Sequence, residues 1–393
     1  MPRLTNPNAS VGRTELPASE ELMKEIRQLL ESGQLSPFFR DFDGGPYVQR
    51  FEKQFARYVG AKYAVSMTNG TLALNAAYAA TQLPPGAKFV TTPWTFVATV
   101  SEIVRAGYTP VFADVDPETG ALDPESIAHT IGAGAACVVP MHLLGVPCEM
   151  DKFLELKKQR NRLLVCEDSC QALGSNYHSR MCGSIGDIGC FSLQQTKSLS
   201  SGEGGVAVTN DENIYDCLRH IRNHGNKYGK FQEKYRDIVA TNFRLTEIQA
   251  AIGLHALREY PSVVKGQLER FNILFDSLTA SQGLVPQKQY SDSSRNGYIV
   301  GSTITTSARH PERARERFLR ENSRFNKGMP GYVVGPGYSE LVYDLPAFRR
   351  FKVTEHPCPN AEGLVKRSVW FDVRKMPIEI VKELARKIEK FKT

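Results

Sequence analysis

The chain has 393 residues, of which 41% are hydrophobic and 23% charged, and its formal net charge is +7. These values are typical of an ordinary soluble globular protein, and the length allows one large domain and a smaller one. The basic residues are scattered among acids, and the denser run at 309–324 is interleaved with glutamates, so nucleic-acid binding is not expected.

The start of the chain shows no targeting signal. Residues 1–17 are polar and lack an apolar core, so we expect an N-terminal arm rather than a signal peptide. No apolar run approaches membrane-spanning length. The eight cysteines form no Cys-x-x-Cys pair, and no histidines stand at zinc-site spacing. We therefore expect reduced cysteines, no metal site, no membrane association and a cytoplasmic location.

The first elements are two helices, at residues 19–32 and 47–58, joined by a loop at 33–45. Strands and helices then alternate, which predicts a mostly parallel α/β sheet. The predicted strands are 62–67, 89–92, 110–115, 137–141 and 163–168, and the predicted helices include 71–80, one opened by Phe96, and 150–159.

The helix start at Asn69, Gly70 and Thr71 directly follows a predicted strand. Glycine lets the backbone approach a ligand closely, and the free amides of a helix start bind phosphate. The alternative is a plain strand-to-helix turn, which is common. Because other motifs of the chain also indicate a phosphorylated cofactor, we favour phosphate binding at this helix start.

The strand at 163–168 is a continuous apolar run that ends in Glu167 and Asp168. Such runs belong to parallel sheets that are covered on both faces, and ligands bind at the carboxyl ends of their strands. His142 also follows a predicted strand. A lone histidine there is more often structural, so we leave it outside the catalytic set.

The stretch at 186–205 sets Lys197 in a polar, glycine-rich loop between two apolar runs. A lysine that attacks a carbonyl needs a confined site, and the hydroxyl of Ser192 could hold an anion nearby. Taken alone, a loop lysine between two strands is the better interpretation. Together with Asp168 the pattern meets the needs of pyridoxal phosphate (PLP), which takes a lysine for its aldehyde and an acid for its pyridinium nitrogen.

Beyond this loop we expect a helix at 212–222, a charged segment at 225–235 and a helix from 246 to 257 that begins with a Thr246/Gln249 capping box. A separate long amphipathic helix is predicted from 261 to 278. From residue 284 the segments become short, with a strand at 298–304, a helix at 312–321, a loop at 333–338 and a closing helix at 378–391.

A long, ordered set of motifs is similar to the DegT/DnrJ/EryC1/StrS family of PLP-dependent sugar aminotransferases. The similarity runs from about residue 15 to 260 and more weakly beyond. The matching residues are Gly45 and Pro46 with Phe51 and Glu52; 69–74; 95–99; His142, Leu143, Leu144 and Gly145; 167–172; 186–205; and Asn242 through Gln249.

The resemblance implies the fold of a fold-type I PLP enzyme, with helices flanking a mostly parallel central sheet. The domains expected from it are an arm at 1–17, a large PLP-binding domain at 18–260, a connecting helix at 261–283 and a small α+β C-terminal domain at 284–393. A homodimer with shared active sites is also implied.

The resemblance also implies roles at the site. Lys197 binds PLP covalently and moves the proton, and Asp168 keeps the pyridine nitrogen protonated. Phe96 stacks on the ring, although without the resemblance Phe96 would be assigned to the core and Trp94 would rival it. Gln171 contacts the ring or its phenolic oxygen. The phosphate is held by Gly70, Thr71, Ser192 and, from the neighbouring subunit, Asn242, which by itself would be interpreted as a polar loop residue.

The resemblance predicts transfer of an amino group from glutamate or glutamine to a nucleotide-linked keto-sugar or a cyclitol ketone. Leu144 departs from the tyrosine of many members. Gln194, Gln195 and Thr196, and the segment 368–371, resemble the branch that aminates ketones such as scyllo-inosose. The alternatives are a dehydratase of the same fold, in which histidine replaces the lysine, and a non-catalytic regulator.

Overall fold

The computed structural model describes residues 19–131, 134–160, 162–225, 234–235, 237–327, 333–352 and 357–393. The predicted arm at 1–17 and most of the charged segment at 225–235 lie outside these residues. No described helix combines the length and apolar character needed to cross a membrane.

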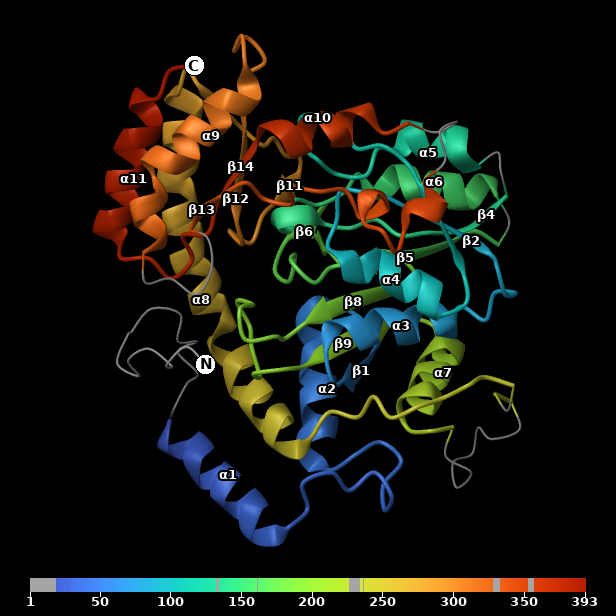
Figure 1. The fold of residues 1–393 in the computed structure, drawn as a ribbon. Coiled ribbons are helices and arrows are strands. Elements are labelled where there is room, and N and C mark those ends of the chain that lie inside the picture. The colour runs from blue at the N-terminus through green and yellow to red at the C-terminus, as the bar shows by residue number, and fades with distance from the viewer. Residues whose placement is uncertain are drawn as a thin grey trace.

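A seven-stranded sheet forms the centre of the large domain, in the order β1-β9-β8-β5-β4-β2-β3 (Figure 1). Six strands run parallel to one another, and β9 alone pairs antiparallel with both its neighbours. The prediction of a mostly parallel sheet is confirmed. The strands are β1 (Tyr63–Met67), β2 (Lys88–Thr91), β3 (Thr109–Phe112), β4 (Ala135–Val138), β5 (Leu164–Asp168), β8 (Ile188–Ser192) and β9 (Gly205–Thr209).

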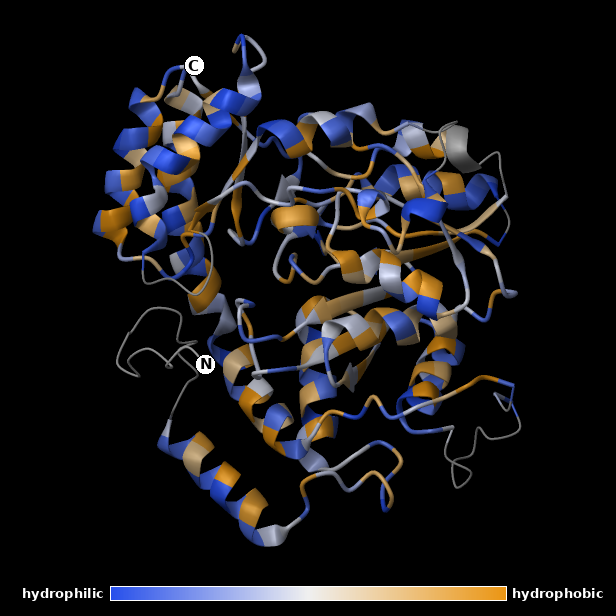
Figure 2. Cartoon of the chain, in the orientation of Figure 1, coloured by the Kyte–Doolittle hydropathy of each residue, from blue (hydrophilic) through white to orange (hydrophobic). Residues whose placement is uncertain are grey.

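Helices cover both faces of this sheet, and so its strands are almost entirely buried. On one face α3 and α7 share an apolar cluster with Val65, Cys166 and Cys190, and on the other α2 and α8 pack on Phe191 and Val206. Figure 2 shows mostly hydrophobic strands between helices that carry both polar and apolar residues. These helices are α2 (Pro46–Val59), α3 (Gly70–Ala80), α4 (Val97–Arg105), α5 (Pro124–Ile131), α6 (Met150–Gln159), α7 (Glu212–Arg222) and α8 (Glu247–Ala280).

Two glutamates from the matching motifs, Glu247 and Glu52, stabilise this architecture. The buried carboxylate of Glu247 accepts the amides of Tyr47 and Val48 at 2.9 and 3.3 Å, which caps the start of α2. Glu52 accepts the amide and the hydroxyl of Ser66, both at 2.7 Å, and pairs with the fully buried guanidinium of Arg222. Burial raises the pKa of Glu52, against the lowering effect of Arg222.

The two helices predicted on either side of residue 260 are a single helix, α8 (Glu247–Ala280). The predicted capping box is confirmed, because the Thr246 hydroxyl accepts the Gln249 amide and the Gln249 side chain accepts the Thr246 amide. Pro261 removes one internal hydrogen bond without ending the helix. Packing explains the difference, because Tyr260, Phe271 and Leu274 are buried along its length.

The small C-terminal sheet is antiparallel, in the order β10-β12-β14-β13. Helices α9 and α11 share its apolar cluster with the far end of α8 (Figure 1). Val334 and Gly335 form a short strand within the predicted loop at 333–338. The elements here are β10 (Leu284–Pro286), β12 (Val300–Ile304), β13 (Val334–Gly335), β14 (Ser368–Phe371), α9 (Pro311–Glu321), α10 (Pro359–Arg367) and α11 (Ile378–Lys390).

The remaining elements are peripheral. Helix α1 (Glu20–Ser32) packs on α8 through Leu22 and Leu29. A three-stranded sheet joins β6 (Asn176–Tyr177), β7 (Arg180–Met181) and β11 (Ser293–Ser294). Short 3-10 helices lie at Leu143–Gly145, Ser323–Asn326, Val342–Asp344 and Arg349–Phe351.

Candidate active site

A cavity of about 820 Å³ opens at the carboxyl end of β5, between the large domain and the small C-terminal sheet. Seven of the eight predicted site residues line it: Gly70, Thr71, Phe96, Asp168, Gln171, Ser192 and Lys197. Tyr298, Tyr338 and Trp370 from the C-terminal region complete one wall. Segments far apart in the sequence therefore meet at one site.

Asp168 is the last residue of β5 and is 2% exposed. One carboxylate oxygen accepts the hydroxyl of Thr99 at 2.7 Å, and the other accepts the amide of Cys170 at 3.1 Å. Thr99 is itself 2.8 Å from the hydroxyl of Thr95, one turn earlier. These bonds fix the orientation of the carboxylate at the cavity wall.

Lys197 is half-buried in the loop between β8 and β9, and its Nζ donates to the hydroxyl of Tyr298 at 3.2 Å. The guanidinium of Arg374 lies 4.1 Å from the centroid of the Tyr298 ring. Burial alone raises the pKa of the Tyr298 phenol, but the positive charges of Lys197 and Arg374 outweigh it, and so this pKa lies below the usual tyrosine value.

The start of α3 and the end of β8 approach each other closely at Gly70 and Ser192. A Cβ on Gly70 would lie 2.7 Å from Cβ of Ser192, so only glycine permits this approach. The Asn69 side chain caps the helix by accepting the Leu72 amide at 2.9 Å. The first amides of α3 and the Ser192 hydroxyl thus share one end of the cavity, in the setting that binds anions.

Phe96 precedes α4 and is 51% exposed, which is unusual for so large an apolar side chain. Its ring centroid is 6.4 Å from that of Tyr338. Gln171 accepts the Leu144 amide at 2.8 Å and donates to the Tyr338 hydroxyl at 3.1 Å. Trp94, the rival for the stacking role, is 3% exposed and does not line this cavity.

Asn242 is the one predicted site residue that lies elsewhere. It is exposed, and its side-chain oxygen accepts the amide of Arg244 at 3.2 Å. Its backbone forms an isolated bridge with Asn223. Within a single chain, Asn242 therefore does not line the cavity that holds the other predicted residues.

His142 lies in a buried network behind the cavity. Its Nε2 is 2.9 Å from Glu167, and its Nδ1 accepts the amide of Cys148 at 3.0 Å. Glu167 also accepts the amides of Gly183, Ile185 and Gly186 at 2.6 to 2.7 Å. Glu167 thus holds the turn between β7 and β8, and His142 links Glu167 to the backbone at Cys148, which is a structural task.

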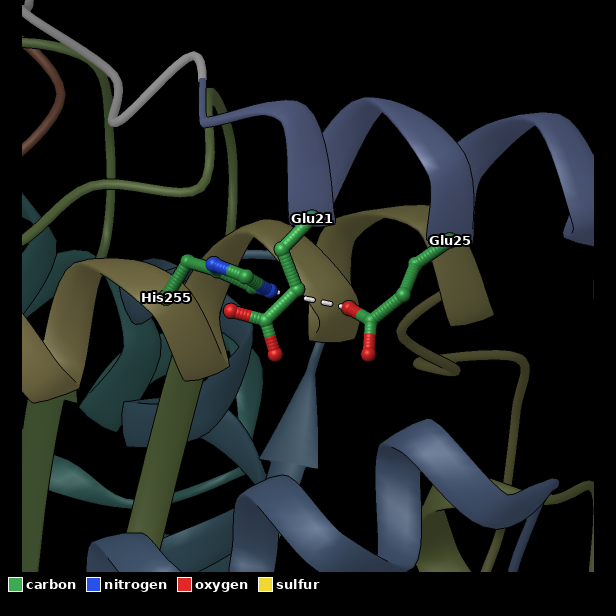
Figure 3. Close-up of side chains that lie close together, drawn as sticks. All are labelled: Glu21, Glu25 and His255. Carbon is green, nitrogen blue, oxygen red and sulfur yellow. Dashed lines mark hydrogen bonds and ion pairs between the residues drawn. The ribbon is translucent and has the colours of Figure 1, made fainter.

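A second group of potential ligand side chains joins α1 to α8. Glu21 and Glu25 on α1 point toward the buried His255 on α8, and their ligand atoms lie within 4.8 Å of one another (Figure 3). Each already has a protein partner: Glu25 is 2.9 Å from Nε2 of His255, and Glu21 accepts from Arg258 at 2.9 Å. These contacts attach α1 to the large domain.

No pattern in the sequence pointed to Tyr298, Tyr338 or Arg374, because each comes from a part of the chain more than a hundred residues away from Lys197. Thr99 lies within the motif at 95–99, but only the structure shows its contact with Asp168. Because Thr95 and Thr99 are four residues apart, a helical pattern in the sequence places both on the same face and does not show which of them contacts Asp168.

The chain matches the family described as the DegT/DnrJ/EryC1/StrS aminotransferase family over residues 3–388. It is 38% identical over 361 residues to the spore coat polysaccharide biosynthesis protein SpsC of Bacillus subtilis, covering 89% of this chain and 88% of that protein. It is 34% identical over 271 residues to the GDP-perosamine synthase of Escherichia coli O157:H7, covering 69% and 73% of the two chains.

Among solved structures, the fold is similar to the aminotransferase from Psychrobacter cryohalolentis. The TM-score is 0.82 at 31% sequence identity, and the match covers 95% of this chain and 98% of that one. The similarity therefore extends over both the large domain and the C-terminal region.

Proposed function

The chain belongs to the DegT/DnrJ/EryC1/StrS aminotransferase family of PLP enzymes, and on that premise we propose that it aminates a keto-sugar or cyclitol ketone with glutamate or glutamine as donor. The observation that carries the proposal is the cavity that brings together Lys197, Asp168 and the start of α3. An amine, a carboxylate and an anion-binding helix start are the three groups that PLP requires.

The residues of the cavity fit PLP. Lys197 would bind its aldehyde, Asp168 its pyridine nitrogen, and Phe96 offers an exposed aromatic face for the ring. The close approach of Gly70 and Ser192, which a Cβ would disrupt, supports binding of the phosphate there. When bound, PLP supplies an electron sink for the carbon that loses its proton.

The side chains of this chain then have distinct tasks. Nζ of Lys197 would hold the cofactor covalently. Once released, it would take up a proton as a base and then, as an acid, deliver that proton to a different atom. Asp168 would accept a hydrogen bond from the protonated ring nitrogen of the cofactor, and the Thr99 hydroxyl keeps that carboxylate in place. Gln171, which donates to the Tyr338 hydroxyl, would contact the cofactor ring.

The acceptor is proposed as a polar, hydroxyl-bearing ketone. The cavity lining includes polar side chains outside the predicted set, namely Glu102, Arg105, Gln194 and Glu203. These groups can hydrogen-bond the hydroxyls of a sugar or cyclitol ring. The resemblance of 194–196 to the cyclitol branch favours a cyclitol ketone, whereas the similarity to a GDP-perosamine synthase favours a nucleotide-linked sugar.

We also propose that the active unit is a homodimer with shared sites. In the single chain, Asn242 is exposed and does not line the cavity that holds the other predicted residues. An exposed asparagine next to the capped start of α8 could reach the phosphate of a neighbouring subunit's PLP. The function proposed for Lys197 and Asp168 does not depend on this contact.

A half-reaction screen tests the proposed function. The purified enzyme is converted to its pyridoxamine form with glutamate or with glutamine. Each candidate ketone is then added, and recovery of the PLP absorbance spectrum is measured. A nucleotide-linked 4-keto sugar and scyllo-inosose distinguish the two acceptor classes. Lys197→Ala, which cannot form the covalent link, is the matched control. Failure of both donors to change the spectrum of wild-type protein would contradict the proposal.

A further inference from the structure

Tyr298 contacts the one nitrogen on which the proposed reaction depends. Its hydroxyl lies 3.2 Å from Nζ of Lys197, and its side chain is almost entirely buried, with 6% of the residue exposed. Asn296 fixes its backbone by accepting the Tyr298 amide at 3.0 Å. The amide nitrogen of the Asn296 side chain donates to the carbonyls of Gln171 and Leu173, so the phenol is anchored to the segment that follows Asp168.

Arg374 lies on the face of the same ring. Its guanidinium is 4.1 Å from the ring centroid, and only 7% of its side chain is exposed. The carboxylate of Asp372 accepts two hydrogen bonds from this guanidinium, from Nε at 2.8 Å and from Nη2 at 2.6 Å. The third nitrogen, Nη1, donates to the carbonyl of Thr196 at 2.8 Å, so Arg374 is also tied to the residue that precedes Lys197.

The charges around the phenol determine which of its forms is favoured. The two nearest cations, Lys197 and Arg374, favour the phenolate, and Asp372 opposes them while remaining paired with Arg374. Burial raises the pKa values of the two other phenols that face Tyr298, so neither adds a charge at neutral pH. Those phenols are Tyr260 on α8 and Tyr338 after β13.

Resting on the proposed function, we propose that Tyr298 exchanges a proton with Nζ of Lys197, and that Arg374 is a positioning residue that acts through Tyr298. When Nζ is released as a free amine, the O–H bond of Tyr298 breaks and an N–H bond forms on Nζ. The phenol becomes a phenolate and the amine an ammonium, so the net charge of the pair is unchanged. The phenolate then faces Arg374, whose fixed positive charge stabilises it, until the proton returns to the phenolate oxygen and restores Nζ as the free amine that takes up the next proton.

The positioning role can be measured without cofactor or substrate. In the cofactor-free full-length protein, the absorbance at 295 nm of wild type minus Tyr298→Phe, followed against pH, isolates one phenol. The same subtraction is then made in the Arg374→Gln background. Because a cation at this distance changes an acid's affinity for its proton by about tenfold or more, we expect the midpoint to rise by at least about one pH unit.

Two further variants separate charge from packing. Arg374→Lys keeps the cation but loses the two-point contact with Asp372, so its midpoint should lie between those of wild type and Arg374→Gln. Tyr260→Phe removes a neighbouring hydroxyl, which donates to the carbonyl of Leu173, and should leave the midpoint unchanged. An unchanged midpoint in Arg374→Gln overturns the role of Arg374. If that variant does not fold, an unchanged midpoint in Arg374→Lys has the same meaning.

The proton exchange itself is tested in the loaded enzyme. Tyr298→Phe should slow a single turnover with the amino donor by about a hundredfold, the lower range for loss of a proton-transfer group, while the covalent link to Lys197 still forms. A wild-type rate in this variant overturns the proton exchange. If wild-type protein itself shows no turnover, the proposed function fails, whereas the titration of Tyr298 remains a separate result.

Discussion

Asp168→Asn is the most informative single substitution, because it removes a charge while nearly preserving shape. The carboxylate is 2% exposed and accepts two hydrogen bonds, from Thr99 and Cys170. Asparagine can still accept the Cys170 amide, and the Thr99 hydroxyl can turn to accept from the new amide group. Only the extra strength of a bond to a charged acceptor is lost, which is about 1–2 kcal/mol of folding stability.

The effect on catalysis should be larger than the effect on stability. A neutral amide cannot hold the pyridine nitrogen in its protonated form, so the electron sink is weakened. We expect the proton shift to slow by at least about a hundredfold, equivalent to about 3 kcal/mol in the barrier. PLP should still attach to Lys197, as borohydride reduction and peptide mapping would show.

Single-turnover absorbance with the amino donor measures this rate, and urea denaturation measures stability. Thr99→Val is the matched control, because it removes the hydroxyl that donates to Asp168 but leaves the charge. It should cost stability yet retain most of the rate. A near-normal rate in Asp168→Asn would refute the role assigned to this carboxylate.

Three further predictions follow from contacts described above. Gly70→Ala places a Cβ 2.7 Å from Cβ of Ser192 and should weaken PLP binding at least about tenfold in equilibrium dialysis. Gly363→Ala is the control, because the atom nearest to its new Cβ lies at 3.6 Å, and it should leave PLP binding unchanged. Glu52→Gln breaks a buried pair with Arg222 and should cost about 3 kcal/mol in urea denaturation, whereas Glu21→Gln at an exposed pair should cost much less. Mixing Lys197→Ala with Asn242→Ala subunits should restore up to about a quarter of wild-type activity, since half of randomly paired dimers would hold one intact site. No recovery, with each variant inactive alone and subunits exchanging, would contradict a shared site.

Much of the large domain was predictable because its signals are local. Continuous apolar runs, such as the one ending at Asp168, are required where helices cover both faces of a sheet. The capping box at Thr246 and Gln249 depends on residues three positions apart, and it forms as predicted. The order of the motifs likewise indicated the family, which the full-length match confirms.

The prediction of two helices around residue 260 was wrong because tertiary packing outweighs the tendency of proline to end a helix. Proline usually ends a helix by removing one donor, yet the buried side chains on both sides of Pro261 hold α8 together. The short strand at Val334 and Gly335 was missed for a similar reason, since its pairing with β14 involves residues far along the chain.

The sequence by itself was enough to propose Lys197 and Asp168 as the residues that carry the chemistry, because their motifs are contiguous and their residue types match the needs of one cofactor. Only the tertiary structure decided what surrounds them. The hydroxyl of Thr99, the phenol of Tyr298 and the guanidinium of Arg374 reach the site from separate elements. Such contacts depend on how the sheets and α8 pack, and no local pattern of residue types encodes how close these side chains come to Lys197 and Asp168.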